Sequence, residues 1–162
     1  AYEDHPWIAP LEQLIRDIVA ADKPLIGVCF GHQIIAQALG GRVEKFAGGW
    51  AVGPQRYRFG DGERTVQAWH QDQVIARPEG AEVVASSDFC ENAALLYPGK
   101  VYTVQPHPEF DDAFITGLID TRGPGVVPDA QLAEARARLR SRLDRDDLAD
   151  QFERFFRNRS LT

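Results

Sequence analysis

A cysteine between two glycines is the residue of this chain best placed to do chemistry. Residues 27–33 have the sequence Gly-Val-Cys-Phe-Gly-His-Gln and follow the apolar segment 24–26. An apolar strand that turns sharply into a helix at a Gly-x-Cys-x-Gly motif is typical of a nucleophile elbow, and we expect Gly27 and Gly31 to make room for the turn. Cys29 would then lie at a helix N-terminus, where the partial positive charge favours the thiolate. The alternative is a buried cysteine on a core strand.

A histidine and a glutamate follow a second apolar strand. Residues 101–110 have the sequence Val-Tyr-Thr-Val-Gln-Pro-His-Pro-Glu-Phe. A thiol nucleophile needs a base, and the base needs an orienting group; His107 and Glu109 are of the right types, and Pro108 biases His107 toward an extended conformation. A strand-end turn with a solvated glutamate is the alternative. Because ligands of open α/β sheets bind at the carboxyl ends of strands, we expect both motifs to meet there.

The two motifs together resemble the class I (triad) glutamine amidotransferase family, and most closely its stand-alone proteins similar to the glutaminase domain of GMP synthase. Segment 68–74, Ala-Trp-His-Gln-Asp-Gln-Val, and segments 86–88 and 92–94 fit the same pattern, so the resemblance covers roughly residues 4–110. It implies an α/β fold of the flavodoxin-like type, with an open, mostly parallel sheet and flanking helices.

The resemblance also implies a catalytic triad. Cys29 would attack the side-chain amide of glutamine as the nucleophile, His107 would act as the base, and Glu109 would orient His107. A glutamyl thioester on Cys29 would then be hydrolysed, and in this family the ammonia passes to a synthase domain or subunit. A synthase partner is therefore one expectation for this chain.

Four residues are candidates for substrate binding. The N–H of Phe30, the residue after the nucleophile, is a natural oxyanion donor in an elbow. The resemblance implies that Gln33 holds the amino-acid end of glutamine, and that the backbone near Gln71 and Asp72 lines the same pocket.

The chain departs from the family pattern at three positions. Pro106 stands where relatives have an aromatic residue before the histidine, and Trp69 and Gln71 stand where relatives have small residues or glycine. The acyl specificity is therefore left open. A γ-glutamyl peptidase or hydrolase with the same triad is the main alternative activity. A regulatory or assembly subunit without catalysis and a redox-sensing thiol are further alternatives.

Family members carry a βαβ region before the elbow, whereas this chain opens with Ala-Tyr-Glu-Asp-His-Pro-Trp. We therefore expect residues 1–162 to form a single amidotransferase-like domain that lacks its first strands. Residues 121–162 would be a C-terminal helical segment of the same domain.

Composition excludes several classes of function. The net charge of −6 argues against general nucleic-acid binding, and no apolar run approaches the length of a membrane span. Two cysteines in different contexts do not indicate a disulfide framework, so we expect a reducing, cytoplasmic location. The four histidines lack metal-ligand spacing and no phosphate-binding loop occurs, so we expect neither a metal nor a cofactor.

Periodicity and turn residues predict the elements that position these motifs. We expect Asp4 to cap the first helix, with Pro6 in its first turn. The expected helices are at about 4–20, 32–39, 111–120, 129–143 and 146–157, and the expected strands at 25–29, 50–59, 64–69, 81–86, 92–97 and 100–105, with hairpin turns at 60–62 and 98–100.

Other reactive residue types have simpler interpretations. Cys90 is expected to pack in the core, and His70 to form part of the pocket wall. For His32, a hydrogen bond that steadies the elbow and a direct substrate contact are both open. The arginines of segment 136–145 alternate with acidic residues and are expected to form a solvated helix face.

Overall fold

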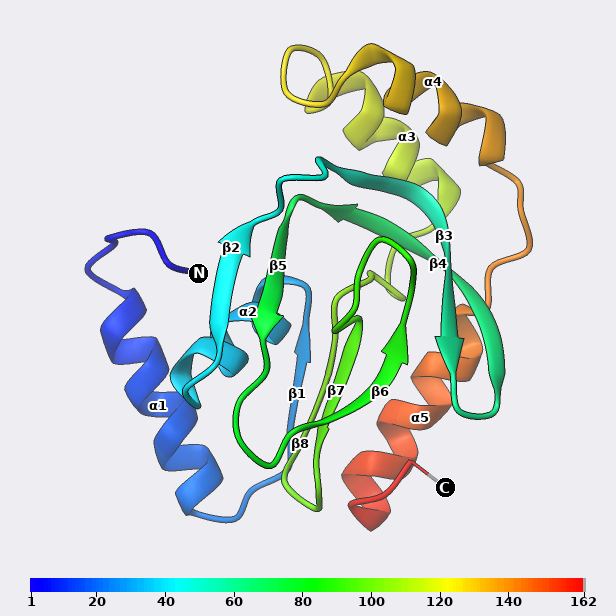
Figure 1. Ribbon diagram of the computed structural model, residues 1–162. Coiled ribbons are helices and arrows are strands. Elements are labelled where there is room, and N and C mark those ends of the chain that lie inside the picture. Colours follow the sequence, from blue (N-terminus) through cyan, green and yellow to red (C-terminus); the bar gives the residue numbers. More distant parts are fainter. Residues whose placement is uncertain (162) are drawn as a thin grey trace.

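The computed structural model describes residues 1–161 (Figure 1). The helices are α1 (Ile8–Ala20), α2 (Phe30–Ala38), α3 (Asp112–Thr121), α4 (Asp129–Arg138) and α5 (Arg145–Asn158). The strands are β1 (Leu25–Val28), β2 (Arg42–Lys45), β3 (Ala51–Phe59), β4 (Gly62–His70), β5 (Asp72–Ala76), β6 (Glu82–Ser86), β7 (Ala94–Tyr97) and β8 (Val101–Val104).

Six strands form the main sheet, in the order β1-β8-β7-β6-β3-β4. Helices flank this sheet, which confirms the expected α/β class. The pairing differs from the mostly parallel sheet that was expected: β1 and β8 are parallel, whereas the other neighbouring pairs are antiparallel. The reason lies in the connections, because the tight turns between β3 and β4 and between β7 and β8 can only join antiparallel strands.

A separate two-stranded ribbon of β2 and β5 lies over α2 (Figure 1). The sequence analysis did not predict these two strands. In β2, Val43 is the one buried residue among exposed charged neighbours. A four-residue strand with a single apolar position leaves too little alternation to be recognised.

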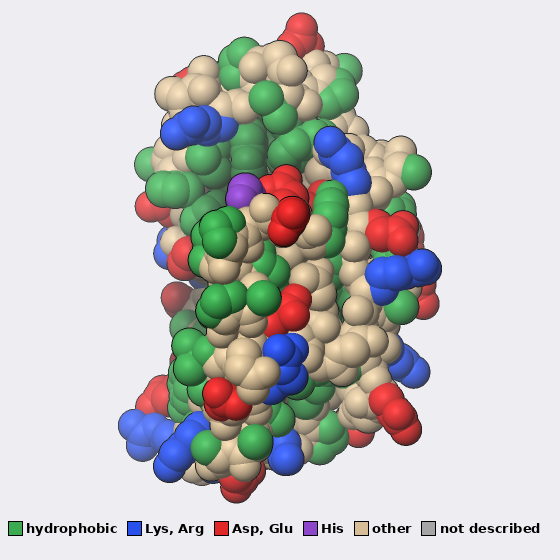
Figure 2. All heavy atoms as spheres, turned by 90° about the vertical axis from the view of Figure 1, so that its left-hand side faces the viewer, with side chains coloured by type: hydrophobic (Ala, Val, Ile, Leu, Met, Phe, Trp, Pro, Cys, Tyr) green, Lys and Arg blue, Asp and Glu red, His purple; other side chains and the backbone are tan. Residues whose placement is uncertain are grey.

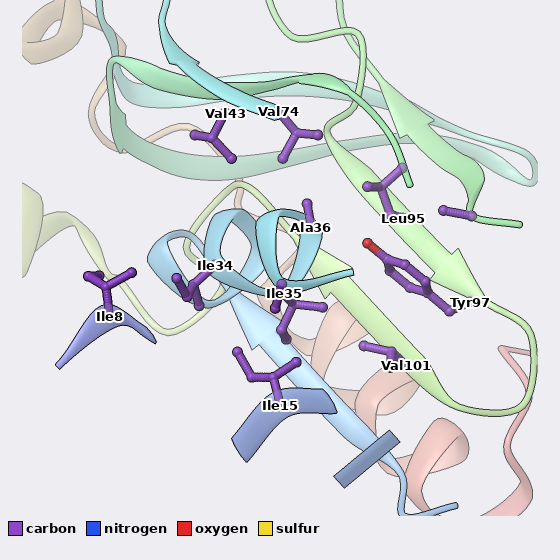
Figure 3. Packing of buried hydrophobic residues seen from close by; sticks show 12 residues of the cluster. Ile8, Ile15, Ile34, Ile35, Ala36, Val43, Val74, Leu95, Tyr97 and Val101 are labelled. Carbon is purple, nitrogen blue, oxygen red and sulfur yellow. The ribbon is translucent and has the colours of Figure 1, made fainter. Parts of the chain in front are cut away.

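Helices α1 and α2 cover one face of the sheet. Figure 3 shows Ile35 of α2 lying between Ile15 of α1 and the strands that carry Leu95 and Val101, and Ile34 lying on the side of α2 that faces Ile8. These side chains form one buried apolar cluster, which holds α2, and with it the end of β1, in a fixed position.

Helix α5 packs against the opposite face of the sheet. Leu148 and Phe155 of α5 are fully buried in a cluster that also contains Tyr57 and Tyr102 of the sheet. The hydroxyl of Tyr102 donates a hydrogen bond of 2.7 Å to Oε1 of Gln151 on α5. Helix α5 is therefore part of the core around the strand that leads to His107.

Two helix boundaries differ from the predictions. Helix α1 begins at Ile8 after Trp7, and its N-cap makes no side-chain hydrogen bond, so the predicted cap at Asp4 is wrong. Helix α4 ends at Arg138 rather than continuing to residue 143. The chain leaves the helix where the N–H of Arg140 donates to the carboxylate of Asp112 at 2.8 Å and the N–H of Asp144 donates to the carbonyl of Thr65 at 2.9 Å.

The face that carries α1 and the N-terminal residues has a mixed surface. Figure 2 shows acidic, basic and apolar side chains interspersed on it rather than gathered by type. Among the described residues, no helix has the length and apolar character that would let it cross a membrane.

Candidate active site

Cys29 lies at a strained turn between β1 and α2. Its backbone has φ 49° and ψ −101°, a region that residues with a side chain rarely occupy. A Cβ atom on Gly27 would come within 2.6 Å of Ile35 Cδ1 and 2.7 Å of the carbonyl carbon of Gly31, so only glycine fits there. At Gly31 a Cβ would meet nothing within 4 Å. The prediction that the turn requires glycine for steric reasons is therefore confirmed at Gly27 and is wrong at Gly31.

Backbone hydrogen bonds hold the elbow in place. The N–H of Cys29 donates to the carbonyl of Val104 at 2.9 Å, and the carbonyl of Cys29 accepts from the N–H of Gln33 at 3.1 Å. Cys29 occupies the N-cap position of α2, where its half-buried side chain meets the positive end of the helix dipole.

His107 is held by contacts on three sides. Its Nδ1 lies 2.6 Å from Oε1 of Glu109, and its backbone N–H donates to the carbonyl of Gln67 in β4 at 2.8 Å. The ring of Phe110 stacks on the imidazole, with the centroids 3.9 Å apart and the planes 5° from parallel. Cys29 also influences the imidazole, since its side chain is among the causes of the raised pKa of His107. The structure therefore holds His107 and Glu109 in direct contact.

The electrostatics of this group favour a charged histidine. Burial lowers the pKa of His107, but hydrogen bonds to Cys29 and Glu109, and the charges of both groups, outweigh it and raise the pKa to about 9. Burial raises the pKa of Glu109, but the hydrogen bond from His107 and the nearby charges of His107 and Arg145 bring the pKa below its usual range.

Two residues that support the triad were missed by the sequence analysis. Arg145, which was expected on a solvated face, donates from Nε to the carbonyl of Pro108 at 2.9 Å and from Nη2 to the carbonyl of Glu109 at 3.2 Å. Nothing local in the sequence signals this contact, because it joins segments 36 residues apart. Phe110 could have been suspected, since an aromatic residue directly after the His-Pro-Glu motif can reach back to the imidazole.

The predicted pocket residues lie in different settings. Gln33 is buried, and its Nε2 donates to the carbonyl of Asp72 at 3.0 Å. The carbonyl of Gln71 instead accepts from the N–H of Phe46 at 3.2 Å. The side chain of Phe30 is 38% exposed and lies 5.7 Å from the ring of Trp7. The structure therefore joins Gln33 to Asp72 directly.

Gln105 is a further residue that was not singled out. It is fully buried at the end of β8, and its Nε2 donates to Sγ of Cys29 at 3.5 Å. Its Oε1 accepts from Nε2 of Gln33 at 3.2 Å. The only signal in the sequence is its position two residues before His107.

His32, His70 and the second cysteine, Cys90, are buried and uncharged at neutral pH. Nδ1 of His32 lies 2.8 Å from Oγ1 of Thr103, and burial, with a smaller effect of the charge of His70, lowers the pKa of His32 to about 3. His32 therefore makes a hydrogen bond within the core, in line with the first of its two interpretations, a hydrogen bond that steadies the elbow, rather than a direct substrate contact. Burial also lowers the pKa of His70 to about 4 and raises the pKa of Cys90 to about 12.

Within residues 1–161, no three side chains of His, Cys, Asp or Glu are grouped so that they could hold a metal ion.

The fold and the site define a class: an α/β protein with a cysteine at a strained strand–helix turn and a histidine–glutamate pair on a neighbouring strand end. The family model of class I glutamine amidotransferases matches residues 4–113. The chain belongs to this family.

Curated relatives from several organisms are similar to this chain. A glutamine amidotransferase-like protein of Schizosaccharomyces pombe is 31% identical over 96% of this chain and 67% of its own length. Gamma-glutamyl peptidase 4 of Arabidopsis thaliana is 31% identical over 74% of this chain and 53% of its own length. The glutamine-hydrolysing GMP synthase of Thermus thermophilus is 44% identical over 57% of this chain and 20% of its own length.

A solved structure has the same fold. A glutamine amidotransferase from Thermotoga maritima superposes with a TM-score of 0.68 and 25% identity, over 85% of this chain and 66% of that one. The present chain thus spans about half to two thirds of the length of several relatives that it matches.

Proposed function

We propose that this chain hydrolyses the side-chain amide of glutamine, with Cys29 as nucleophile, His107 as acid and base, and Glu109 as the group that orients His107. One observation carries the proposal: Nδ1 of His107 lies 2.6 Å from the carboxylate of Glu109, and the cysteine at the strained elbow is among the groups that raise the pKa of this imidazole. Family membership supports the same chemistry.

In the first step, the thiolate of Cys29 attacks the amide carbon and the C–S bond forms. The carbonyl oxygen becomes an oxyanion, for which the backbone N–H of Phe30, at the start of α2, is the proposed donor. His107 is protonated at neutral pH and gives its proton to the departing nitrogen as the C–N bond breaks. Ammonia leaves, and the glutamyl group stays on Cys29 as a thioester.

In the second step, His107 is neutral and accepts a proton from a water molecule that attacks the thioester. The C–S bond breaks, and the thiolate of Cys29 and the imidazolium of His107 are restored. The product leaves as glutamate after its new carboxyl group gives one proton to solvent. Glu109 lies 2.6 Å from Nδ1 of His107 and stabilises the charge that His107 carries before the first step and regains in the second.

The substrate pocket is proposed to lie between α2 and the start of β5. Gln33 and Asp72 are joined there by a hydrogen bond of 3.0 Å, and this arrangement supports a role for both in binding the amino-acid end of glutamine. Gln71, next to Asp72, contributes its backbone to the same wall. A synthase subunit that takes up the ammonia is part of the proposal, since the GMP synthase of Thermus thermophilus is named as glutamine-hydrolysing.

Ammonia release from glutamine tests the proposal. The unaltered chain is expected to release ammonia, and Cys29→Ala to lose the activity. Cys90→Ala is the matched control, because Cys90 is the second free cysteine and lies buried with a raised pKa. A chain that binds glutamine without releasing ammonia, alone or with an added synthase subunit, would overturn the catalytic role in favour of a regulatory one.

A second candidate is hydrolysis of γ-glutamyl peptides by the same triad. The similarity to Gamma-glutamyl peptidase 4 favours it. The exposed rings of Trp7 and Phe30 beside the elbow also favour it, because a peptide leaving group needs contacts that ammonia does not. Measuring kcat/KM for glutamine and for γ-glutamyl dipeptides decides between the two functions. The true substrate class is expected to give the higher kcat/KM, and Cys29→Ala is expected to abolish both activities.

A further inference from the structure

The side chain of Gln105 lies between the nucleophile and the proposed substrate pocket. None of it is exposed to solvent, and its amide contacts Sγ of Cys29 at one end and Nε2 of Gln33 at the other. Its backbone N–H donates to the carbonyl of Ala93 at 2.7 Å, which ties it to the segment that enters β7. A buried amide held in this way has little freedom to turn.

The hydrogen bonds also fix which end of the amide faces the sulfur. The carbonyl of Asp72 can only accept, so the group of Gln33 that faces it must be the NH₂. The second hydrogen of that NH₂ is donated to Gln105, which must therefore present its oxygen to Gln33. The NH₂ of Gln105 is then left for Cys29, where it donates to the sulfur over 3.5 Å.

A donor aimed at sulfur acts differently on the two forms of the side chain. A hydrogen bond to a charged acceptor is stronger than one to a neutral acceptor, so the amide of Gln105 stabilises the thiolate more than the thiol. The same donor restricts where the sulfur can lie.

We propose that Gln105 is a positioning residue that stabilises the thiolate of Cys29 and links it, through Gln33, to the pocket for the amino-acid end of the substrate. The link rests on the proposed function, because it assigns that pocket to Gln33. Gln33 donates both amide hydrogens within the protein, to Asp72 and to Gln105. A ligand that moves Gln33 therefore also moves the amide of Gln105 and changes its hydrogen bond to the sulfur of Cys29.

The pH profile of Cys29 alkylation by iodoacetamide tests the stabilising role without any substrate. Gln105→Met keeps the bulk of the side chain and removes the donor. We expect the midpoint of the alkylation rate to move upward by about one pH unit, which corresponds to the loss of one hydrogen bond to a charged group. For glutamine hydrolysis we expect kcat to fall about tenfold, with a smaller change in KM.

Gln151→Met is the matched control. Gln151 is also a buried glutamine with one side-chain partner, Tyr102, but it lies on α5 and does not contact Cys29. The Gln151→Met variant should lose stability, as Gln105→Met does, but should leave the pH profile of Cys29 alkylation unchanged. An unchanged profile for Gln105→Met, or an equal shift in both variants, would overturn the proposal.

Gln105→Glu provides a second variant of nearly identical shape if Gln105→Met does not fold. It keeps an acceptor for Gln33 and replaces the donor that faces the sulfur, so the alkylation midpoint should again move upward; an unchanged midpoint in this variant contradicts the proposal. Failure of the unaltered chain to hydrolyse glutamine would count against the proposed function alone, because alkylation reports on Cys29 without turnover.

Discussion

Nδ1 of His107 lies 2.6 Å from Oε1 of Glu109, and the two residues are joined by a turn in which the N–H of Phe110 donates to the carbonyl of His107 at 3.2 Å. The carboxylate therefore fixes which nitrogen of the imidazole faces Cys29. It also stabilises the protonated ring, because the charge and hydrogen bond of Glu109 contribute to the raised pKa of His107. Orientation and charge can be separated by experiment, since each depends on a different property of Glu109.

Glu109→Gln should keep the orientation of His107 and remove the charge. The amide oxygen can still accept from Nδ1, but the pKa of His107 should fall toward its ordinary value. We expect kcat for glutamine to drop by about a hundredfold, within the range of general acid–base effects. Steady-state ammonia release measures this change. Glu91→Gln, at an exposed glutamate, is the control, and an equal loss in both variants would contradict the role of Glu109.

The raised pKa of His107 predicts how stability depends on pH. Because the pKa in the folded chain is about 9 and the ordinary value is 6.5, the folded state holds this proton more tightly. The stabilisation is fully present below about pH 6.5 and is lost as the pH rises through about 9, with a size of the order of a few kcal/mol in the free energy of unfolding.

Urea unfolding across this pH range measures the effect. The His107→Gln variant should not show this loss of stability as the pH rises. Cys29→Ala should shift it to lower pH, because the hydrogen bond and charge of Cys29 are among the causes of the raised pKa. A stability that does not change between neutral and alkaline pH in the unaltered chain would show that the imidazolium is not held by its neighbours.

The site could be predicted from the sequence where its signals are local. Gly27 and Cys29 mark the strained turn, and His107 and Glu109, which follow a strand two residues apart, are in direct contact; their roles were suggested by the family resemblance. Arg145 and Gln105 could not be assigned in this way. Their contacts with the triad depend on how α5 and β8 pack, and an arginine among acidic residues has the same pattern when it is solvated.

The fold shows the same division. Strong apolar strands and tight turns predicted most elements of the main sheet. The end of α4 was missed because its composition remains helical beyond Arg138, and tertiary bonds from Arg140 to Asp112 and from Asp144 to Thr65 end the helix. Local propensity is a weak guide wherever such contacts compete with it.

Gly27 and Gly31 provide a matched pair for testing the elbow. Gly27→Ala should destabilise the chain by about 1–3 kcal/mol, because the added Cβ would clash with Ile35 and with the backbone of Gly31. Gly31→Ala lies in α2 with open space around it, and should leave the free energy of unfolding equal or raise it by up to about 1 kcal/mol. Urea unfolding compares the two, and equal destabilisation would contradict the elbow geometry described for Gly27.

Arg145 is predicted to support the His-Pro-Glu turn from α5. Its guanidinium donates to the carbonyls of Pro108 and Glu109, so its loss should let the turn move and misalign His107 with Cys29. We expect Arg145→Ala to lower kcat by about tenfold, in line with the sensitivity of catalysis to small displacements. Steady-state kinetics with glutamine measure this effect.

Arg145→Lys should recover only part of the lost activity, because an ammonium group cannot reproduce the two donors of the planar guanidinium. Arg142→Ala is the control, since the side chain of Arg142 is 93% exposed and its nearest charged partner is Asp144 at 3.6 Å. If Arg145→Ala and Arg142→Ala gave the same kcat, the contact of α5 with the turn would be structural only. A loss confined to Arg145→Ala, with the unfolding midpoint preserved, would show that α5 acts on the alignment of the triad rather than on the stability of the fold.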